Sequence, residues 1–222
     1  IAELLDATDD IQRGESSVAI LSMEVKTARY ERTVQLKAWS KGVDNSLILI
    51  EAPAKDKGIA TLKVGDNIWN YLPKVDRTMK VPSGMMSSSW MGSHFSNDDL
   101  VKDNRLSDQF TAQIESKPVD GTGSWVLRLS PKPDAPVVWG AVVVRVSAQM
   151  VPESVEYFDE DGPLARTMRF EQVQSIEGRQ VPMVMMLIPA DKPTEYTKIT
   201  YQSLSFSEDI PEGVFSLQGL KQ

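Results

Sequence analysis

The chain has 222 residues, of which 41% are hydrophobic and 25% are charged, and its formal net charge is −7 at pH 7. These proportions are ordinary for a globular protein, and the negative charge argues against binding to the phosphate backbone of nucleic acids. The absence of cysteine excludes disulfide bonds, thiolate metal sites and cysteine nucleophiles from these residues.

The first fourteen residues are predicted to form a short helix. Apolar residues of Ile1–Gly14 recur at steps of three and four, and the closing glycine is a common helix terminator. No secretory leader is visible here, and the longest uncharged apolar runs, Val137–Val144 and Val181–Ala190, are too short to span a bilayer. We therefore expect a soluble chain, such as a mature product whose leader has been removed.

From Ser17 onward apolar and polar residues alternate, which is the period of a β-strand. A first strand begins at Ser17, and further strands are predicted at Arg32–Ser40, Leu47–Ile50, Ile59–Val64, Ile68–Leu72, Arg77–Val81, Phe110–Glu115, Trp125–Ser130, Val138–Ala148, Ser154–Phe158, Leu164–Val173, Val181–Ile188 and Tyr196–Phe206. A sheet of roughly eleven or more strands must curl or close to protect its edges. No linker, composition shift or repeat divides the chain, so a single domain is predicted over residues 1–222.

Residues 83–105 interrupt this alternation. Met85, Met86, Trp90, Met91 and Phe95 stand there among serines and glycines. Large apolar side chains in such a segment need a surface to cover. Two interpretations stay open: the segment caps a core, or it lines the mouth of an apolar cavity and closes over a guest.

Several short motifs stand out, namely Ala52–Pro53, Gly58–Leu62, Trp69–Pro73, Ser89–Leu100, Tyr157–Asp159 with Gly162, and Pro211–Phe215. Together they resemble the periplasmic lipoprotein-carrier (LolA-like) superfamily, and in particular its outer-membrane lipoprotein-sorting subgroup. The resemblance implies a mainly β fold, an open, unclosed antiparallel β-barrel, and the alternating segments give this barrel about eleven strands. Short helices would form a lid over an apolar cavity that takes acyl chains. The chain departs from the family pattern at His94, where an aspartate is usual.

The resemblance and the apolar pattern together predict a lipid-binding cavity with its lid. Methionine side chains repack around irregular guests at low cost, and six of the ten methionines lie in two short segments, 85–91 and 183–186. The same methionines would also fill an irregular core, and this alternative stays open. The predicted cavity and lid residues are Leu47, Leu49, Trp69, Tyr71, Met85, Met86, Trp90, Met91, Phe95, Leu127, Met168, Phe170, Met183, Met185 and Leu187.

Catalytic chemistry has little support in the sequence. His94 is the single histidine, so no two-histidine metal site forms within one chain, and no GxSxG motif accompanies it. A Ser–His–Asp arrangement using His94 nevertheless stays open. Asp98 and Asp99 precede an apolar pair and are interpreted as the first residues of a helix, with Asp103 nearby. Asp159–Asp161 are interpreted as turn residues. We expect no enzyme activity, no metal and no cofactor.

Three cations precede the interrupted segment. Lys74, Arg77 and Lys80 are best interpreted as solvated charges of an edge strand, with contact to a lipid head group as the alternative. The predicted function is a periplasmic carrier that holds acyl chains and sorts lipid or lipoproteins toward the outer membrane. The alternative is a lipid- or lipoprotein-sensing accessory subunit of a membrane system. Expected partners are the acyl chains of lipoproteins or lipids and a protein of the inner or outer membrane, and no nucleic acid.

Overall fold

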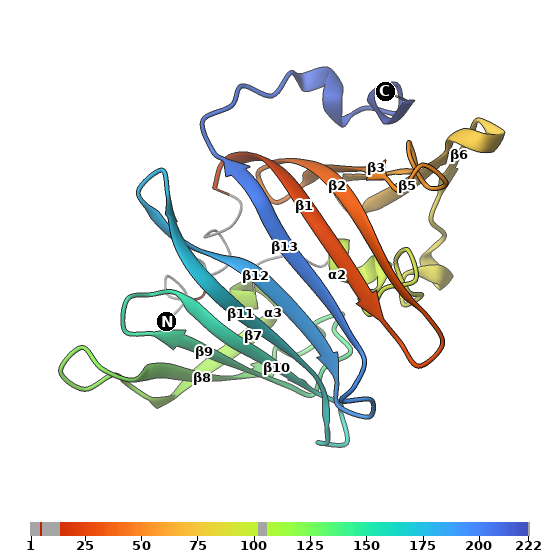
Figure 1. Cartoon of the computed structure of the whole chain (residues 1–222). Coiled ribbons are helices and arrows are strands. Elements are labelled where there is room, and N and C mark those ends of the chain that lie inside the picture. The colour runs from red at the N-terminus through yellow and green to blue at the C-terminus, as the bar shows by residue number, and fades with distance from the viewer. Residues whose placement is uncertain (1–4, 6–13, 102–105, 222) are drawn as a thin grey trace. The chain divides into compact units, whose positions relative to one another are not determined.

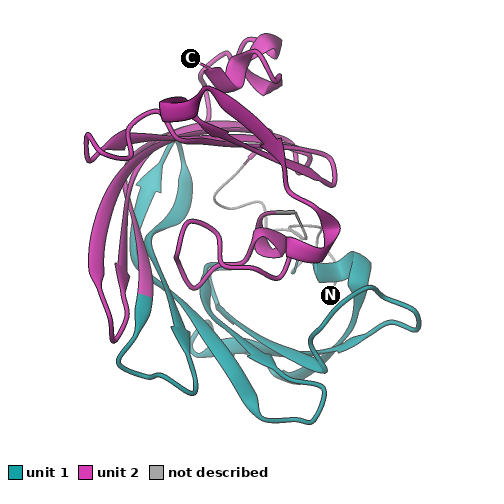
Figure 2. Cartoon of the chain, turned by 90° about the vertical axis from the view of Figure 1, so that its right-hand side faces the viewer, with its two compact units in different colours: residues 1–12, 104–196 teal, residues 13–103, 197–222 magenta. Residues whose placement is uncertain are grey.

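The computed structural model describes residue 5, residues 14–101 and residues 106–221 (Figure 1). The helix predicted over Ile1–Gly14 therefore lies almost wholly outside the described residues; of its apolar positions, Leu5 is described, and it is helical and buried. Chain contacts divide the protein into two compact units (Figure 2): unit 1 comprises Ile1–Gln12 with Asn104–Tyr196, and unit 2 comprises Arg13–Asp103 with Thr197–Gln222. The single domain expected from the sequence stays a prediction.

In the described part of the chain, hydrogen bonding joins thirteen strands into one open antiparallel sheet, in the order β6-β5-β4-β3-β2-β1-β13-β12-β11-β10-β9-β8-β7. This confirms the mainly β, open antiparallel fold class. Each of the thirteen alternating segments forms a strand, slightly more than the count of about eleven that we predicted. The edge strand predicted around Arg77 and Lys80 is indeed the first strand in the order.

The elements of unit 2 are β1 (Ser16–Lys26), β2 (Glu31–Lys41), β3 (Asn45–Ala52), β4 (Ala60–Val64), β5 (Asn67–Leu72), η1 (Pro73–Val75), β6 (Arg77–Lys80), η2 (Ser83–Met85), α2 (Asn97–Val101), η3 (Glu212–Phe215) and η4 (Gly219–Lys221). Strand β13 (Tyr196–Ser205) belongs to this unit from its second residue onward. No helix in the described part of the chain is long and apolar enough to cross a membrane.

The elements of unit 1 are α3 (Leu106–Gln109), β7 (Phe110–Ser116), β8 (Ser124–Pro131), β9 (Ala141–Ser147), β10 (Pro152–Phe158), β11 (Leu164–Ile176) and β12 (Arg179–Pro189). Strand β9 begins three residues later than the alternation predicts. A Cβ on Gly140 would lie 2.7 Å from the backbone oxygen of Asp159, because the chain passes directly under the turn that follows β10. That close approach ends the regular ladder before Ala141.

The sheet of unit 2 presents two faces with different side chains. Leu47, Leu62 and Trp69 are paired in register across β3, β4 and β5, and they define the face that we call the Leu62 face. Thr61, one residue away, lies on the opposite face, here called the Thr61 face. Because side chains along a strand alternate between the two faces of the sheet, each face packs against a different part of the chain.

The C-terminal segment covers the Leu62 face. Ile210, Val214 and Leu220 are buried in one cluster with the apolar residues of that face, among them Leu47 and Leu62. Figure 1 shows this segment, with η3 and η4, running beside the strands of unit 2 after the end of β13. The segment therefore acts as a second layer of unit 2.

Unit 1 has one apolar face, defined by a row of residues that are paired in register across five strands. The row consists of Leu127, Val144, Val155, Met168 and Leu187. The apolar face forms a core cluster to which buried Leu5 and Phe110 also belong.

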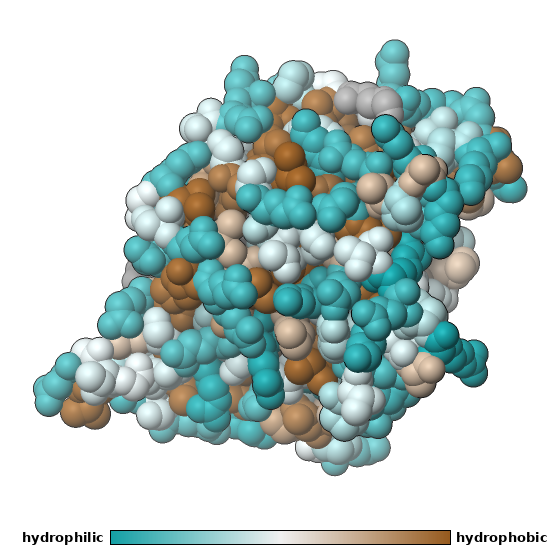
Figure 3. Space-filling view, viewed as in Figure 1, coloured by the Kyte–Doolittle hydropathy of each residue, from teal (hydrophilic) through white to brown (hydrophobic). Residues whose placement is uncertain are grey.

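The opposite face of the same strands is mostly polar. One of its rows contains Arg145, Ser154 and Arg169, which are paired in register across β9, β10 and β11. Figure 3 shows one side of the whole molecule, on which hydrophilic residues are interspersed with apolar ones, as expected for a surface turned to solvent.

Candidate functional site

Residues 83–97, which we call the methionine segment, form a folded loop held by hydrogen bonds. The backbone N–H of Trp90 donates to the carbonyl oxygen of Phe95 over 2.7 Å, and Ser89 and Ser96 form an isolated β-bridge. The buried side chain of Asn97 donates to the carbonyl oxygens of Met85, at 3.1 Å, and Ser88, at 3.2 Å. These bonds satisfy several backbone groups of the loop and hold it in a defined conformation within unit 2.

Trp90 anchors the methionine segment to the Thr61 face. Its side chain is only 3% exposed, and its indole Nε1 donates to Oγ1 of Thr61 over 3.1 Å. The hydroxyl of Thr61 in turn donates to Oδ1 of Asn70 over 2.7 Å. A buried tryptophan whose N–H has a partner is a strong packing anchor.

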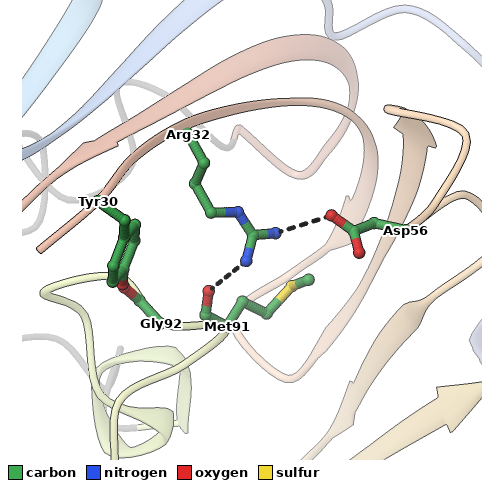
Figure 4. A network of polar contacts seen from close by, with 5 residues as sticks. All are labelled: Tyr30, Arg32, Asp56, Met91 and Gly92. Carbon is green, nitrogen blue, oxygen red and sulfur yellow. Dashed lines mark hydrogen bonds and ion pairs between the residues drawn. The ribbon is translucent and has the colours of Figure 1, made fainter.

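A second attachment joins the methionine segment to β2 and to the turn before it (Figure 4). The Tyr30 hydroxyl donates to the carbonyl oxygen of Gly92, and Nη1 of Arg32 donates to that of Met91 over 3.4 Å. Nη2 of Arg32 also forms an ion pair with Oδ2 of Asp56 at 3.4 Å. Gly92 has a φ of +71°, and a Cβ there would lie 3.0 Å from the Tyr30 hydroxyl oxygen, so glycine suits this position.

His94 holds the methionine segment to β13. Its backbone N–H donates to Oγ1 of Thr197 over 2.9 Å, and its Nδ1 lies 2.8 Å from the same oxygen. Thr197 is fully buried. Because the backbone N–H uses one acceptor position of the hydroxyl, the hydroxyl proton remains available to Nδ1. Through these two contacts with Thr197, His94 attaches the methionine segment to β13.

The helix start predicted at Asp98 and Asp99 is confirmed. Both residues lie in the first turn of α2. The carboxylate of Asp99 accepts hydrogen bonds from the backbone N–H of Ser96, at 2.7 Å, and from its hydroxyl, at 2.9 Å. The hydroxyl of Ser96 accepts from the N–H of Asp99 over 3.1 Å, which completes a reciprocal capping box.

The remaining acidic residues considered in the sequence are Asp159–Asp161 and Asp103. The turn predicted at Asp159–Asp161 is also observed. Asp103 lies outside the described residues, and the described part of the chain contains no group of three metal-ligating side chains.

The five lid residues predicted from the sequence do not share one environment. Trp90 is buried, whereas Met86, Met91 and Phe95 are half-buried. Met85 is 53% exposed, which corrects the expectation that all five point toward an apolar surface. Met85 ends the short η2 turn, and its carbonyl oxygen accepts a hydrogen bond from the side chain of Asn97.

Four predicted cavity residues lie on the Leu62 face, on the side of the sheet opposite to Trp90: Leu47, Leu49, Trp69 and Tyr71. They pack against the C-terminal segment and therefore do not line one cavity with the methionine segment. A pocket on this face, between Trp39, Leu47, Leu49, Ala60, Gly219 and Leu220, has a volume of about 10 Å³. That is room for about one water molecule and not for an acyl chain.

The six remaining predicted residues are brought together on the apolar face of unit 1: Leu127, Met168, Phe170, Met183, Met185 and Leu187. Met168 pairs with Leu187, and Phe170 pairs with Met185. Leu127, Met183 and Leu187 are buried, whereas Met168, Phe170 and Met185 are half-buried. The apolar face thus keeps accessible apolar surface at β11 and β12.

Sequence reasoning missed a cluster that borders this face. The guanidinium carbon of Arg166 lies 4.6 Å from the ring centre of Trp139 and 4.5 Å from that of Tyr157. The two rings lie 5.2 Å apart with a tilted geometry. The sequence could have indicated this cluster, because Arg166 and Met168 are two residues apart and their side chains therefore lie on one face of a strand.

A family model described as "uncharacterized protein" matches residues 42–222, and the chain belongs to that family. No curated protein matches the sequence.

Solved structures of similar fold cover nearly the full chain. A DUF1329 family protein from Desulfovibrio piger is 21% identical with a TM-score of 0.87, covering 99% of this chain and 97% of that one. A putative outer membrane lipoprotein-sorting protein domain from Vibrio parahaemolyticus is 23% identical with a TM-score of 0.84, covering 100% and 98%. A LolA superfamily protein from Nitrosomonas europaea is 22% identical with a TM-score of 0.77, covering 98% and 97%. The LolA-like fold predicted from the sequence motifs is confirmed.

Proposed function

We propose that this protein is a periplasmic carrier that holds acyl chains of lipids or lipoproteins on the apolar face of unit 1 and helps to sort them toward the outer membrane. The observation that carries the proposal is the half-buried state of Met168, Phe170 and Met185 beside fully buried Leu127 and Leu187. A guest that covers these side chains removes apolar surface from water, which is the main driving force for binding lipid.

The composition of the apolar face suits a guest of variable shape. Met168 and Met185 carry flexible, polarizable side chains, and Phe170 lies between them in the register of β11 and β12. Such side chains change rotamer at low cost, so a carrier built from them accepts chains that differ in length or unsaturation.

The energies permit reversible carriage. Burying an acyl chain gains about 0.8 kcal/mol per methylene, so a sixteen-carbon chain gains about 12 kcal/mol before costs. Ordering the guest and the side chains around it, together with the loss of translational and rotational freedom, offsets several kcal/mol of this gain. Binding and release therefore need no covalent step.

We further propose that the protein binds its guest without catalysing a reaction on it. The most concentrated polar groups of the methionine segment already have structural contacts: His94 contacts Thr197, and Asp99 caps α2. The periplasmic location is supported by the similarity to a lipoprotein-sorting protein domain and a LolA superfamily protein.

Titration with a neutral lipid tests the proposal. A pyrene-labelled monoacylglycerol should bind saturably to the full chain, and Met185→Gln should weaken binding at least fivefold because it places an amide on the apolar face. The matched control is Met150→Gln, since Met150 is exposed in the turn before β10. Absence of saturable binding, or equal binding by the two variants, would contradict the proposal.

A further inference from the structure

The strands β1 to β6 of unit 2 are connected at two ends of their sheet. Because consecutive strands are antiparallel neighbours, every second connection lies at the same end. The connections β1–β2, β3–β4 and β5–β6, which are residues 27–30, 53–59 and 73–76, lie at one end. The connections β2–β3 and β4–β5, residues 42–44 and 65–66, lie at the opposite end.

The first of these ends, which we call the basic end, carries an excess of positive charge. Its three connections contain four exposed cations, Arg29, Lys55, Lys57 and Lys74. They also contain two acidic residues, and each of these already has a cationic partner outside the connections. Asp56 forms an ion pair with Arg32 at 3.4 Å, and Asp76 forms one with Lys221 at 2.9 Å. Among the described residues, the four cations form no ion pair of their own.

The charges that flank the connections do not change this contrast. Besides Arg32, the charged residues within two positions of the basic-end connections balance each other; they are Lys26, Arg77, Glu31 and Glu51. At the opposite end, Asp44 and Asp66 are the charged residues of the connections, and the flanking residues Lys41 and Lys63 offset them. In a chain with a net charge of −7, the basic end is therefore a local reversal of sign.

The three connections of the basic end are neighbours in space. The ion pair between Arg32 and Asp56 joins the start of β2 to the β3–β4 connection (Figure 4). A Cβ on Gly58 would lie 3.2 Å from Cγ of Pro73, so the β3–β4 and β5–β6 connections are in contact. The four cations thus belong to one continuous end of the sheet.

The geometry of the basic end favours a planar partner with diffuse negative charge. Turns at the ends of strands are convex, and lysine is a flexible point charge without a fixed geometry of recognition. Val75, which is 65% exposed, lies between Lys74 and Asp76 in one of these turns. An anionic bilayer accepts cations at its head groups and an apolar side chain at its interface. A stable complex with a protein instead needs a broad complementary surface.

We propose that the basic end of unit 2 docks on the anionic phospholipid surface of a membrane. Each lysine or arginine close to such a surface strengthens binding about fivefold, so four cations give a strong preference for anionic lipid. The proposal goes beyond acyl-chain carriage and does not depend on it, because docking needs no guest in unit 1.

Co-sedimentation of the full chain with lipid vesicles tests the proposal. The probes are vesicles of phosphatidylcholine alone and vesicles in which one third of this lipid is replaced by phosphatidylglycerol. At low ionic strength the protein should bind the anionic vesicles about tenfold more tightly, or better. Added salt should remove most of this preference, because the cations are exposed and salt screens their charge.

Replacing three cations of the basic end tests their role. The combined variant Lys55→Gln, Lys57→Gln and Lys74→Gln should bind anionic vesicles about tenfold more weakly than wild type. The matched control replaces three exposed lysines elsewhere by glutamine, namely Lys41, Lys117 and Lys192. This control changes the net charge by the same amount and should stay within about twofold of the wild-type affinity.

A fluorescent label gives a second measurement that does not depend on the lysine variants. Because the chain has no cysteine, Ala54→Cys at the basic end and Asp44→Cys at the opposite end each accept one environment-sensitive fluorophore. On addition of anionic vesicles, the emission of the label at position 54 should shift to shorter wavelength. The emission of the label at position 44 should stay unchanged.

Four results would overturn the proposal. Equal binding to the two kinds of vesicle would mean that anionic lipid is not recognised. Equal losses in the two triple variants would mean that net charge alone governs binding. An equal emission shift at positions 44 and 54 would mean that the basic end does not face the bilayer. Binding of soluble polyglutamate as tight as that of anionic vesicles would identify an acidic protein as the partner instead of a membrane.

Discussion

The two units differ in how they cover their sheet. In unit 2 the chain itself supplies a layer on both faces: Leu220 and its neighbours cover the Leu62 face, and Trp90 is buried against the Thr61 face. In unit 1 the apolar face is buried at Leu127 and half-buried at Phe170 and Met185, and half-buried residues such as Leu49 and Trp69 also occur on the Leu62 face. The two units therefore differ less in the exposure of these side chains than in their cover, because Leu49 and Trp69 pack against the cluster that contains the C-terminal segment. This difference is our reason for proposing the binding surface in unit 1.

The largest expected effect is the loss of the tryptophan anchor in unit 2. Trp90→Ala removes a side chain that is 3% exposed, together with the hydrogen bond from its indole to Thr61. We expect the free energy of unfolding to fall by about 3–5 kcal/mol, as for other buried aromatic residues. Urea denaturation followed by circular dichroism measures it.

Two further substitutions test whether the loss of stability in Trp90→Ala reflects the burial of its side chain in unit 2. Met85→Ala lies in the same segment but is exposed, and should change stability by less than about 0.5 kcal/mol. Phe170→Ala, on the half-buried face of unit 1, should cost clearly less than Trp90→Ala. Equal losses for Trp90→Ala and Phe170→Ala would show that the two faces are covered to the same extent, and the comparison would not hold.

The next effect concerns the C-terminal layer of unit 2. Leu220→Ala should lower the free energy of unfolding by about 2–4 kcal/mol, because Leu220 is 1% exposed and contacts the Leu62 face. The control is Leu217→Ala in the same segment, where the side chain is 50% exposed. A loss below about 1 kcal/mol for Leu220→Ala would mean that the segment is not an integral layer.

The sequence predicted the strands well because their signal is local. Alternation over segments such as Leu164–Val173 and Val181–Ile188 depends only on neighbouring residues, and all thirteen segments form strands. The helix start at Asp99 was predictable for the same reason, since a capping box spans four residues. Strand β9 was predicted too long because the contact of Gly140 with the next turn is not local.

The candidate site was predicted only in part because alternation does not say what covers each face. Leu47 and Trp69 have the same pattern as Met168 and Met185, yet the structure packs Leu47 and Trp69 into one cluster with the C-terminal segment. Nothing in the local sequence around Leu220 identifies its target. Thr61 accepts the hydrogen bond from the indole of Trp90, but its local sequence is that of an ordinary strand residue and does not predict this contact.

The smallest expected effect concerns the ion pair that holds the end of the C-terminal layer. Nζ of Lys221 lies 2.9 Å from Oδ1 of Asp76, and the hydroxyl of Tyr71 donates to the same oxygen over 3.1 Å. The hydrogen bonds from Lys221 and then Tyr71 hold the pKa of Asp76 below its ordinary value. The hydrogen bond to Asp76, together with its charge, raises the pKa of Lys221.

These two shifts give the sign of the pH dependence. The carboxylate stabilises the fold above its unfolded-state pKa, and this stabilisation is lost as pH falls through its lower folded-state pKa. The ammonium stabilises the fold below its unfolded-state pKa, and this stabilisation is lost as pH rises through its higher folded-state pKa. Lys221→Met should therefore lower Tm slightly near neutral pH and flatten the Tm profile at both the acidic and the alkaline end.

Salt should reduce the difference between Lys221→Met and wild type, because both side chains are solvent-exposed and such pairs are screened. The matched control is Lys192→Met, since Lys192 lies in unit 1, 3.9 Å from Asp191, in a pair that is more exposed. Scanning calorimetry from acidic to alkaline pH, at low and high salt, measures both variants. If Lys192→Met alters the Tm profile as much as Lys221→Met, the pair at the C-terminus is an ordinary surface contact. The C-terminal layer is then held by Leu220 and its apolar neighbours alone.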